Sequence, residues 1–184
     1  MTDLVERETV TDAGAIQSPD SSLALNEIAD RFLWSVQTDH SGSLSDFTGA
    51  VFGSTPRSGE VLKMDSLRLL SLWPHKAWLL SSNTQLPRTV DGFGDIMTDI
   101  GHGFCEFRLG GEQALDFLGS YCSANPAEQS GGAIRCLRCL LGQYQVVLWW
   151  EDNADIRLLV DRSYARSFYD YLASLLARWS QPSP

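Results

Sequence analysis

The sequence lacks the features on which nucleic-acid-binding and membrane proteins depend. Only two of its 184 residues are lysines, Lys63 and Lys76, and the formal net charge is −9. Because affinity for nucleic acid comes mainly from neutralisation of phosphates by Lys and Arg, so acidic a chain is not expected to bind DNA or RNA. The longest apolar runs, such as residues 146–150, are far shorter than the ~20 residues of a membrane-spanning helix. We therefore expect no nucleic-acid partner and no membrane span.

Motifs for cofactors and for export are also missing. The chain has no phosphate-binding loop, no Gly-x-Gly-x-x-Gly after a strand and no nucleophile elbow. Its first residues have neither the basic nor the apolar segment of a signal peptide. Four cysteines without such a signal are typical of the reducing cytoplasm, where thiols stay free. We expect a cytoplasmic protein with no catalytic, cofactor-binding or metal-ligating residue of its own.

Acidic residues are concentrated near the N-terminus. The first thirty residues hold seven acidic side chains against Arg7 alone, and few large apolar ones. Such a composition is typical of segments that do not fold by themselves. It predicts an acidic mobile tail over residues 1–29, followed by a single domain over residues 30–180. With 43% hydrophobic residues and six tryptophans, the chain can bury a sizeable core.

Apolar and polar residues alternate with the period of a β-strand in several segments. The predicted strands cover residues 30–38, 67–73, 77–81, 96–109, 134–141, 143–150 and 155–160. Helical spacing of apolar residues predicts helices over residues 43–52, 114–122 and 165–179. Hairpin-linked strands interleaved with a few helices favour an α+β fold with mainly antiparallel sheets.

Four motifs follow one another along the chain. They are the hairpin Leu72–Leu80; Asp99-Ile100-Gly101-His102-Gly103 with Leu109, Gly111, Ala114 and Leu118; Leu141-Gly142-Gln143 leading into an apolar strand; and Arg162-Ser163-Tyr164-Ala165 opening the last helix. This order resembles the folate-binding aminomethyltransferase superfamily. Within it, the order is similar to the gamma subunits of heterotetrameric sarcosine oxidases.

The resemblance covers residues 30–179 and implies two small ferredoxin-like lobes, over residues 30–93 and 94–180. It also implies a non-catalytic gamma subunit of a complex that oxidatively demethylates sarcosine or another N-methyl amino acid and transfers the one-carbon unit to tetrahydrofolate. Other subunits would hold the cofactors FAD, FMN, NAD, tetrahydrofolate and zinc. These partners would be a large folate- and nicotinamide-binding alpha subunit, a flavin-binding beta subunit and a small zinc-binding delta subunit.

Two alternatives remain open. One is a small stand-alone folate-binding protein with its own one-carbon activity. Against it, residues 140–145 lack the Lys, the Cys and the Glu of the Lys-Gly-Cys-Tyr-x-Gly-Gln-Glu motif in folate proteins of iron–sulfur repair. In addition, Gly101 stands where many superfamily members carry Ser. The other alternative is an unrelated α+β ligand-binding module, for which the four motif matches would be accidental.

Asp99 and His102, within the second motif, could form an acid–base pair. Residues three apart on a strand point to opposite faces, so the two side chains meet only if Gly101 and Gly103 make a bulge. Alternatively, the glycines turn the chain and the polar pair satisfies backbone groups. We favour this structural interpretation of Asp99 and His102, and we assign a structural role to Gly111 as well.

The pair Cys136-x-x-Cys139 has the spacing of a metal or redox motif. A zinc knuckle needs a turn that points both thiolates at one ion, but no Gly or Pro stands between these two cysteines. On a strand their thiols diverge. The two remaining cysteines, Cys105 and Cys122, complete no recognisable second pair, so we expect four free thiols and no metal site.

Trp149 and Trp150 are neighbours on a predicted strand. Adjacent strand residues point to opposite faces, so both indoles are buried only if both faces of the strand are covered. One face belongs to the domain's own core. The other is covered either by the chain's own elements or by a partner subunit. Because Trp is favoured as an interface anchor, Trp149 and Trp150 are the candidate subunit-interface residues.

Overall fold

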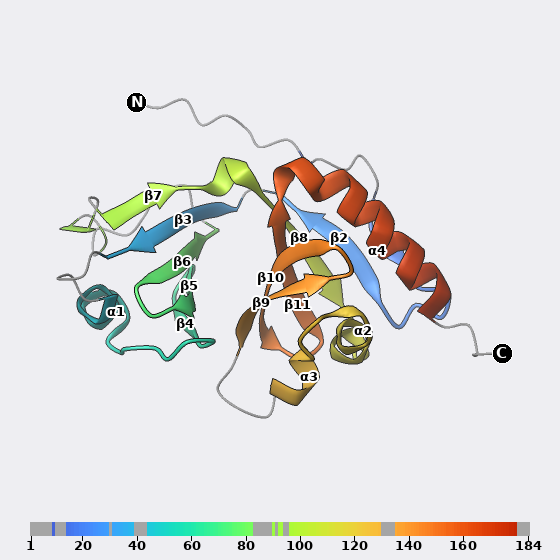
Figure 1. Ribbon diagram of the computed structural model, residues 1–184, viewed down its shortest axis with the longest axis horizontal. Helices are drawn as coiled ribbons and strands as arrows, with labels where there is room; N and C mark the ends of the chain where they lie inside the picture. Colours follow the sequence, from blue (N-terminus) through green and yellow to red (C-terminus); the bar gives the residue numbers. More distant parts are fainter. Residues whose placement is uncertain are drawn as a thin grey trace.

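The computed structural model describes residues 9, 14–29, 31–38, 44–82, 90, 92–93, 96–129 and 135–179. Within these residues the chain forms a five-stranded sheet and a six-stranded sheet. The two sheets lie side by side, and Figure 1 shows helices on the outside of each. All strand pairs are antiparallel. The predicted α+β class, with two small ferredoxin-like lobes and mainly antiparallel sheets, is confirmed.

The first sheet is built mainly from the first half of the chain. Its order is β4 (Val61–Met64), β5 (Leu67–Trp73), β6 (Lys76–Ser81), β3 (Phe32–Gln37) and β7 (Met97–Asp99). The hairpin β5–β6 turns at Pro74–His75, as predicted. Helix α1 (Leu44–Phe52) covers one face of this sheet, with Phe47 among the residues of that core. It ends at Gly53, whose φ of +70° is readily adopted only by glycine. Residue 43, the predicted start, lies outside the described residues.

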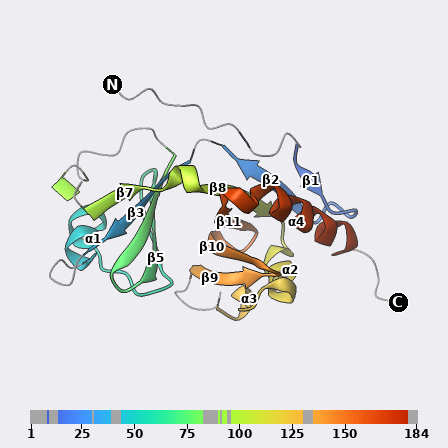
Figure 2. The ribbon, with the colours of Figure 1, turned by 45° about the horizontal axis from the view of Figure 1, so that its top comes forward.

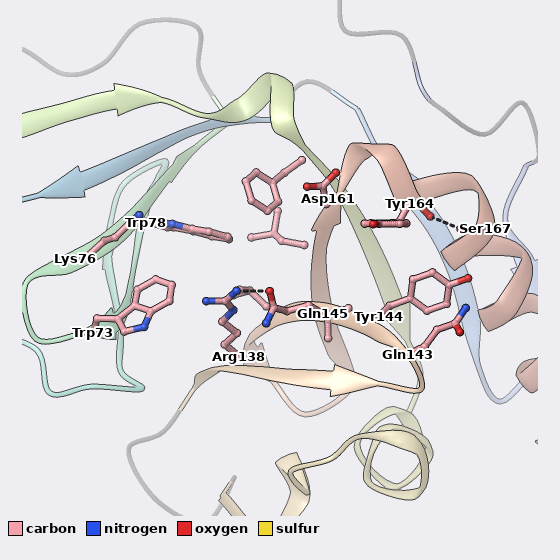
Figure 3. Close-up of a pocket in the computed structure, with 14 residues that line it drawn as sticks. Trp73, Lys76, Trp78, Arg138, Gln143, Tyr144, Gln145, Asp161, Tyr164 and Ser167 are labelled. Carbon is pink, nitrogen blue, oxygen red and sulfur yellow. Dashed lines mark hydrogen bonds between the residues drawn. The ribbon is translucent and has the colours of Figure 1, made fainter.

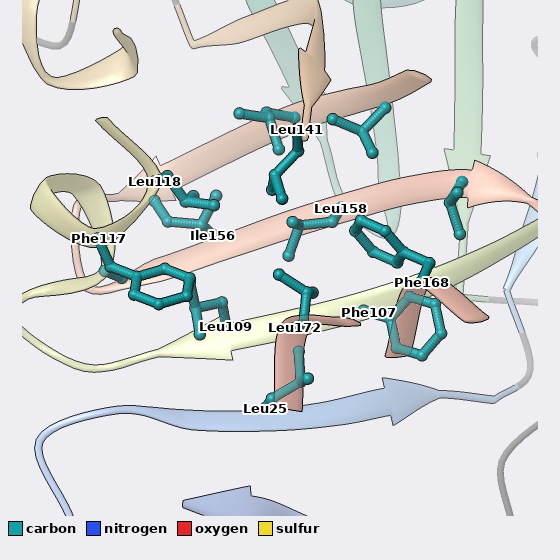
Figure 4. Packing of buried hydrophobic residues seen from close by; sticks show 14 of the residues in the cluster. Leu25, Phe107, Leu109, Phe117, Leu118, Leu141, Ile156, Leu158, Phe168 and Leu172 are labelled. Carbon is teal, nitrogen blue, oxygen red and sulfur yellow. The ribbon is translucent and has the colours of Figure 1, made fainter. Parts of the chain in front are cut away.

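The second sheet contains the three hairpin-linked strands predicted over residues 134–141, 143–150 and 155–160, which form a meander. Its order is β1 (Ile16–Gln17), β2 (Ala24–Ile28), β8 (Phe104–Gly110), β11 (Asp155–Asp161), β10 (Tyr144–Asp152) and β9 (Cys136–Leu141). The helices that follow its strands are α2 (Ala114–Tyr121), α3 (Pro126–Gln129) and α4 (Ala165–Trp179). Helix α4 presents the apolar stripe predicted for it, and Figure 4 shows Phe168 and Leu172 packed against Phe107 and Leu158. These side chains form the larger core of the molecule.

The prediction of a mobile tail through residue 29 is wrong for residues 16–28. Strand β2 pairs with β8, with Leu25 opposite Leu109, and both Leu23 and Leu25 are 0% exposed. The composition of this segment was misleading, because a strand that pairs with a neighbouring strand needs only a few apolar side chains of its own to join the sheet. The predicted division into lobes over residues 30–93 and 94–180 changes too, since strands β1 and β2, at the start of the chain, belong to the second sheet. Residues 1–8 and 10–13 lie outside the described residues.

The continuous strand predicted over residues 96–109 is also wrong. Strand β7 belongs to the first sheet and β8 to the second, and a 3₁₀ turn, η2 (Gly101–Gly103), separates them. Figure 2 shows this segment crossing from one sheet to the other. The two glycines of the turn break the strand, although the alternation of apolar and polar residues continues across it. The lobes therefore meet at residues 100–103, not at residue 93.

A third apolar cluster joins the two sheets. The first sheet contributes Leu33, Leu70, Trp78 and Leu80, and the second contributes Cys136, Val147, Trp149 and Leu159. The carboxylate of Glu106 is buried at the same contact, where Arg31 Nε lies 3.0 Å from its Oε2. Burial raises the pKa of Glu106, and the charges of Arg31 and Arg157 oppose part of that rise. Apolar packing and this ion pair hold the sheets together.

Candidate functional site

A groove opens where the first sheet stops covering the second. Its volume is about 1060 Å³, and it lies between the β5–β6 hairpin and the strands β9, β10 and β11. Figure 3 shows Trp73 and Trp78 on one side, Asp161 and Tyr164 on the other, and Arg138 with Gln145 between them. A concave site of this size with a few convergent polar groups is the usual form of a binding site. This groove is the candidate functional site.

The groove is positioned by strand register. On β10, Gln145 and Val147 point into it because alternate residues of a strand share one face. Arg138 on β9 lies directly opposite Val147. Trp73 pairs with Lys76 at the end of the β5–β6 hairpin. Much of the groove is therefore carried by hydrogen-bonded strands, which hold these side chains in a defined arrangement.

One wall of the groove is aromatic. The Trp78 ring packs edge-on against Phe104, with centroids 4.7 Å apart, and against Trp73, with centroids 6.4 Å apart. On the opposite wall the Tyr164 side chain, in the 3₁₀ turn η3 (Arg162–Tyr164), is 58% exposed. Exposed aromatic surface facing a concave site favours binding of another ring or of an apolar side chain.

Two cations stand beside the aromatic wall. The Arg138 guanidinium lies 5.6 Å from the centroid of the Trp73 ring, and Lys76 Nζ lies 5.8 Å from it. Both distances are within the range of a cation–π contact. Arg138 also donates a hydrogen bond to Gln145 Oε1, which fixes the guanidinium in the groove. This end of the groove can hold an anionic group next to an aromatic one.

Asp161 places a negative charge at the other end. Its carboxylate accepts hydrogen bonds from Ser163 Oγ (2.6 Å) and Ser163 N–H (2.9 Å). These two bonds lower the pKa of Asp161, so the group is ionised at neutral pH. The same bonds cap the 3₁₀ turn η3, which leads directly into α4. The groove therefore has separate positive and negative ends.

Asp99 and His102 lie at η2. Gly101 N–H donates to Asp99 Oδ1 at 2.8 Å, and His102 is exposed. The bulge required for an acid–base pair is replaced by a 3₁₀ turn, in which the Asp99 carboxylate binds the backbone. Gly111 has a φ of +129°, and a Cβ added there would lie 2.0 Å from the carbonyl oxygen of Ser22. This position therefore needs glycine, both for its backbone angle and for the close approach of another segment.

The cysteines of the Cys136-x-x-Cys139 motif point to opposite faces of β9. Cys136 lies in the cluster between the sheets, and Cys139 in the helix-covered core. Cys139 instead lies near Cys122, which forms a β-bridge with Leu141 on the same face of β9, and no sequence pattern indicates this pairing. Within the described part of the chain, no three His, Cys, Asp or Glu side chains are grouped as metal ligands.

The proposed interface residues Trp149 and Trp150 are both buried by the chain itself. Trp150 is 0% exposed in the helix-covered core, and Trp149 is 4% exposed between the sheets. The Arg157 guanidinium lies 5.8 Å from the Trp149 ring centroid. Of the two alternatives left by the sequence, the structure shows coverage by the chain's own elements, because the first sheet covers the face on which Trp149 lies. Among the described residues, the one exposed aromatic side chain, Tyr164, lies in the groove instead.

A second polar region lies on the other side of the sheet contact, but its charges are already paired. Glu151 forms ion pairs with Lys63 (2.9 Å) and Arg68. Asp155 lies 3.0 Å from Nε of both Arg108 and Arg157. Because each carboxylate already faces two cations, this region stabilises the contact between the sheets and is a weaker candidate for ligand binding than the groove.

Comparison with known proteins found matches among solved structures, but none among family profiles or curated sequences. Among solved structures, the chain is similar to one in the heterotetrameric sarcosine oxidase from Corynebacterium sp. U-96 in complex with pyrrole 2-carboxylate. The TM-score is 0.75 at 18% sequence identity, and the match covers 92% of this chain and 91% of that chain. At this identity the similarity establishes the fold.

None of the described helices has the length and apolar character to cross a membrane.

Proposed function

We propose that this chain is the gamma subunit of a heterotetrameric sarcosine oxidase-type complex. The observation that carries the proposal is the structural match over 92% of this chain and 91% of that chain. Nearly the whole of both chains is matched, so the similarity includes both sheets and their mutual placement, not one common motif. The four ordered sequence motifs support the same assignment independently.

In this proposal the complex oxidatively demethylates sarcosine or another N-methyl amino acid and passes the one-carbon unit to tetrahydrofolate. The alpha, beta and delta subunits hold the tetrahydrofolate, FAD, FMN, NAD and zinc. The chain contributes a rigid pair of sheets and a surface that contacts the large subunit. Its groove is the best-formed surface for that contact, because exposed Tyr164 and half-buried Trp73 can anchor a partner there.

Co-expression tests this function. The chain is produced together with the large, flavin-binding and zinc-binding subunits of a sarcosine oxidase-type complex, and the tagged large subunit is purified. We expect a stoichiometric four-subunit complex with N-methyl amino acid oxidation, and lower yield or stability when this chain is omitted. If the other three subunits assemble and turn over equally well without it, the proposal fails.

Two variants locate the contact. Tyr164→Ala removes the exposed ring in the groove, and we expect weaker assembly by about 2 kcal/mol, as for a truncated anchor residue. Leu140→Ala is the matched control, because Leu140 is the other large apolar side chain exposed in the described residues and does not line the groove. Equal assembly of both variants would place the contact elsewhere on the chain.

A stand-alone folate-binding protein is the second candidate, and the groove supplies its supporting observation. A pterin ring could stack on the wall formed by Trp73 and Trp78, with glutamate carboxylates at Arg138 and Lys76. Titration of the purified chain with tetrahydrofolate, followed by tryptophan fluorescence, distinguishes the two functions. Saturable micromolar binding that is lost in Arg138→Ala would favour this candidate, and no quenching would favour the subunit.

A further inference from the structure

Cys122 and Cys139 are brought together by an antiparallel pairing. After α2 the chain runs along β9, where Cys122 forms a bridge with Leu141. Ser123 N–H donates to the Leu140 carbonyl (2.8 Å), and Gly142 N–H donates to the Tyr121 carbonyl (3.3 Å). Because alternate residues of β9 share a face, Cys139 lies on the same side as Leu141. Both sulfurs therefore lie at the same core, into which Cys139 is buried and Cys122 is partly buried.

The two thiols are neighbours on the same side of the paired segments. The neighbouring thiol lowers the pKa of Cys139 and raises that of Cys122, so Cys139 is the more readily deprotonated of the two. Cys122 is only partly covered, while Cys139 is buried. A small oxidant can thus approach the pair from the Cys122 side.

The other two cysteines have no such partner among the described residues. Cys105 is buried on β8, and burial raises its pKa to about 11. Cys136 is buried on the opposite face of β9, burial raises its pKa to about 12, and its thiol donates to the Glu60 carbonyl at 3.5 Å. Both stay protonated at neutral pH and are poor nucleophiles. The chain therefore contains one reactive pair and two internal controls.

We propose that Cys122 and Cys139 are a peroxide-reactive pair that closes to a reversible disulfide. The Cys139 sulfur attacks one oxygen of hydrogen peroxide, the O–O bond breaks, and Cys139 sulfenic acid forms while the departing hydroxide takes up a proton as water. The Cys122 sulfur then attacks the Cys139 sulfur, forming the S–S bond and breaking the S–O bond. The leaving hydroxyl takes the Cys122 proton as a second water. Two thiols are oxidised, one peroxide is reduced, and a dithiol reverses the reaction.

The disulfide would tie the end of α2 to β9. It closes the segment between residues 122 and 139, which includes α3, and so limits the freedom of that segment in the unfolded chain. The oxidised protein should therefore melt at a higher temperature than the reduced one. This inference is independent of the proposed subunit function, because it concerns the full chain alone.

Mass spectrometry of the full chain tests the pair. The reduced protein is treated with equimolar hydrogen peroxide, remaining thiols are alkylated, and intact mass and digested peptides are measured. We expect a loss of two hydrogen atoms, two alkylated cysteines instead of four, and one cross-linked peptide joining Cys122 to Cys139. Dithiothreitol should restore all four thiols. Overoxidation without a cross-link, or a cross-link between other cysteines, overturns the proposal.

Serine variants provide matched controls. Cys122→Ser and Cys139→Ser should abolish the cross-link and the rise in melting temperature on oxidation, whereas Cys105→Ser and Cys136→Ser should retain both. Circular dichroism establishes that each variant is folded. If Cys139→Ser fails to fold, the wild-type peptide map together with Cys122→Ser decides the question. Retention of the disulfide signal in Cys122→Ser would contradict the assignment.

Discussion

The two faces of the second sheet are made from the same strands and have opposite characters. Toward α2 and α4, β10 presents Val146, Leu148 and Trp150 to a closed apolar core. On its other face, Val147 and Trp149 are covered by the first sheet, but exposed Gln145 opens into the groove. The closed face accounts for the fold, because it buries the larger apolar surface. The open face carries the convergent aromatic and charged groups, so it is where binding is expected.

A pair of tryptophan variants tests this contrast most strongly. Trp150→Ala should lower the free energy of unfolding by about 3–5 kcal/mol, because it leaves a large cavity in the closed core. Trp73→Ala, at the groove, should cost less than about 1.5 kcal/mol because this side chain is only partly buried. Urea unfolding of both variants provides the measurement. Equal losses would mean that the groove is as tightly packed as the core.

A glycine pair tests whether the N-terminal strands are docked on the second sheet. Gly111→Ala should destabilise the protein by about 2 kcal/mol or more, because of its φ of +129° and the collision with the Ser22 carbonyl. Gly103→Ala is the control, since an added Cβ there meets nothing within 4 Å. Melting temperatures of the two variants give the comparison. If they agree, the segment around Ser22 is not held against Gly111.

The contact between the sheets should respond to pH through Glu106. Its pKa is raised in the folded chain, so its contribution to stability is complete below its ordinary value of 4.5 and is lost as pH rises through the folded value. Glu106→Gln should remove this loss. The stability of the variant relative to wild type should therefore increase with pH above 4.5, as measured by urea unfolding across that range. A difference that is constant with pH would show that Glu106 titrates normally.

Local periodicity was sufficient to predict most of the fold. The β5–β6 hairpin, the meander of β9, β10 and β11, and helix α4 have uninterrupted alternation or helical spacing. The incorrect predictions concern segments whose structure is determined by tertiary contacts. Strand β2 depends on pairing with β8, and the segment 97–110 changes sheets at two glycines without interrupting its pattern. Neither a partner strand nor a change of sheet is encoded in a single segment.

The candidate site was less predictable than the fold. The groove combines side chains from β5, β6, β9, β10 and β11, and its form depends on how far the first sheet extends over the second. The same packing covers Trp149, which the sequence left open to a partner. Similarly, Cys122 and Cys139 meet only through the pairing of residues 121–123 with β9. Such juxtapositions follow from the arrangement of elements, which strand and helix periods do not determine.

The smallest expected effect concerns the charge on the open face. Arg138→Gln should leave the free energy of unfolding within about 0.5 kcal/mol of wild type, because the guanidinium lies at an exposed position. It should weaken the proposed subunit assembly by about 1 kcal/mol, the range of a solvent-screened ion pair, and more at low salt than at high salt. Arg178→Gln on α4 is the control, being exposed and outside the groove. Assembly measured at two ionic strengths separates the cases. A salt-independent loss would assign Arg138 to packing on Trp73, and no loss would leave the aromatic side chains as the only determinants of binding in the groove.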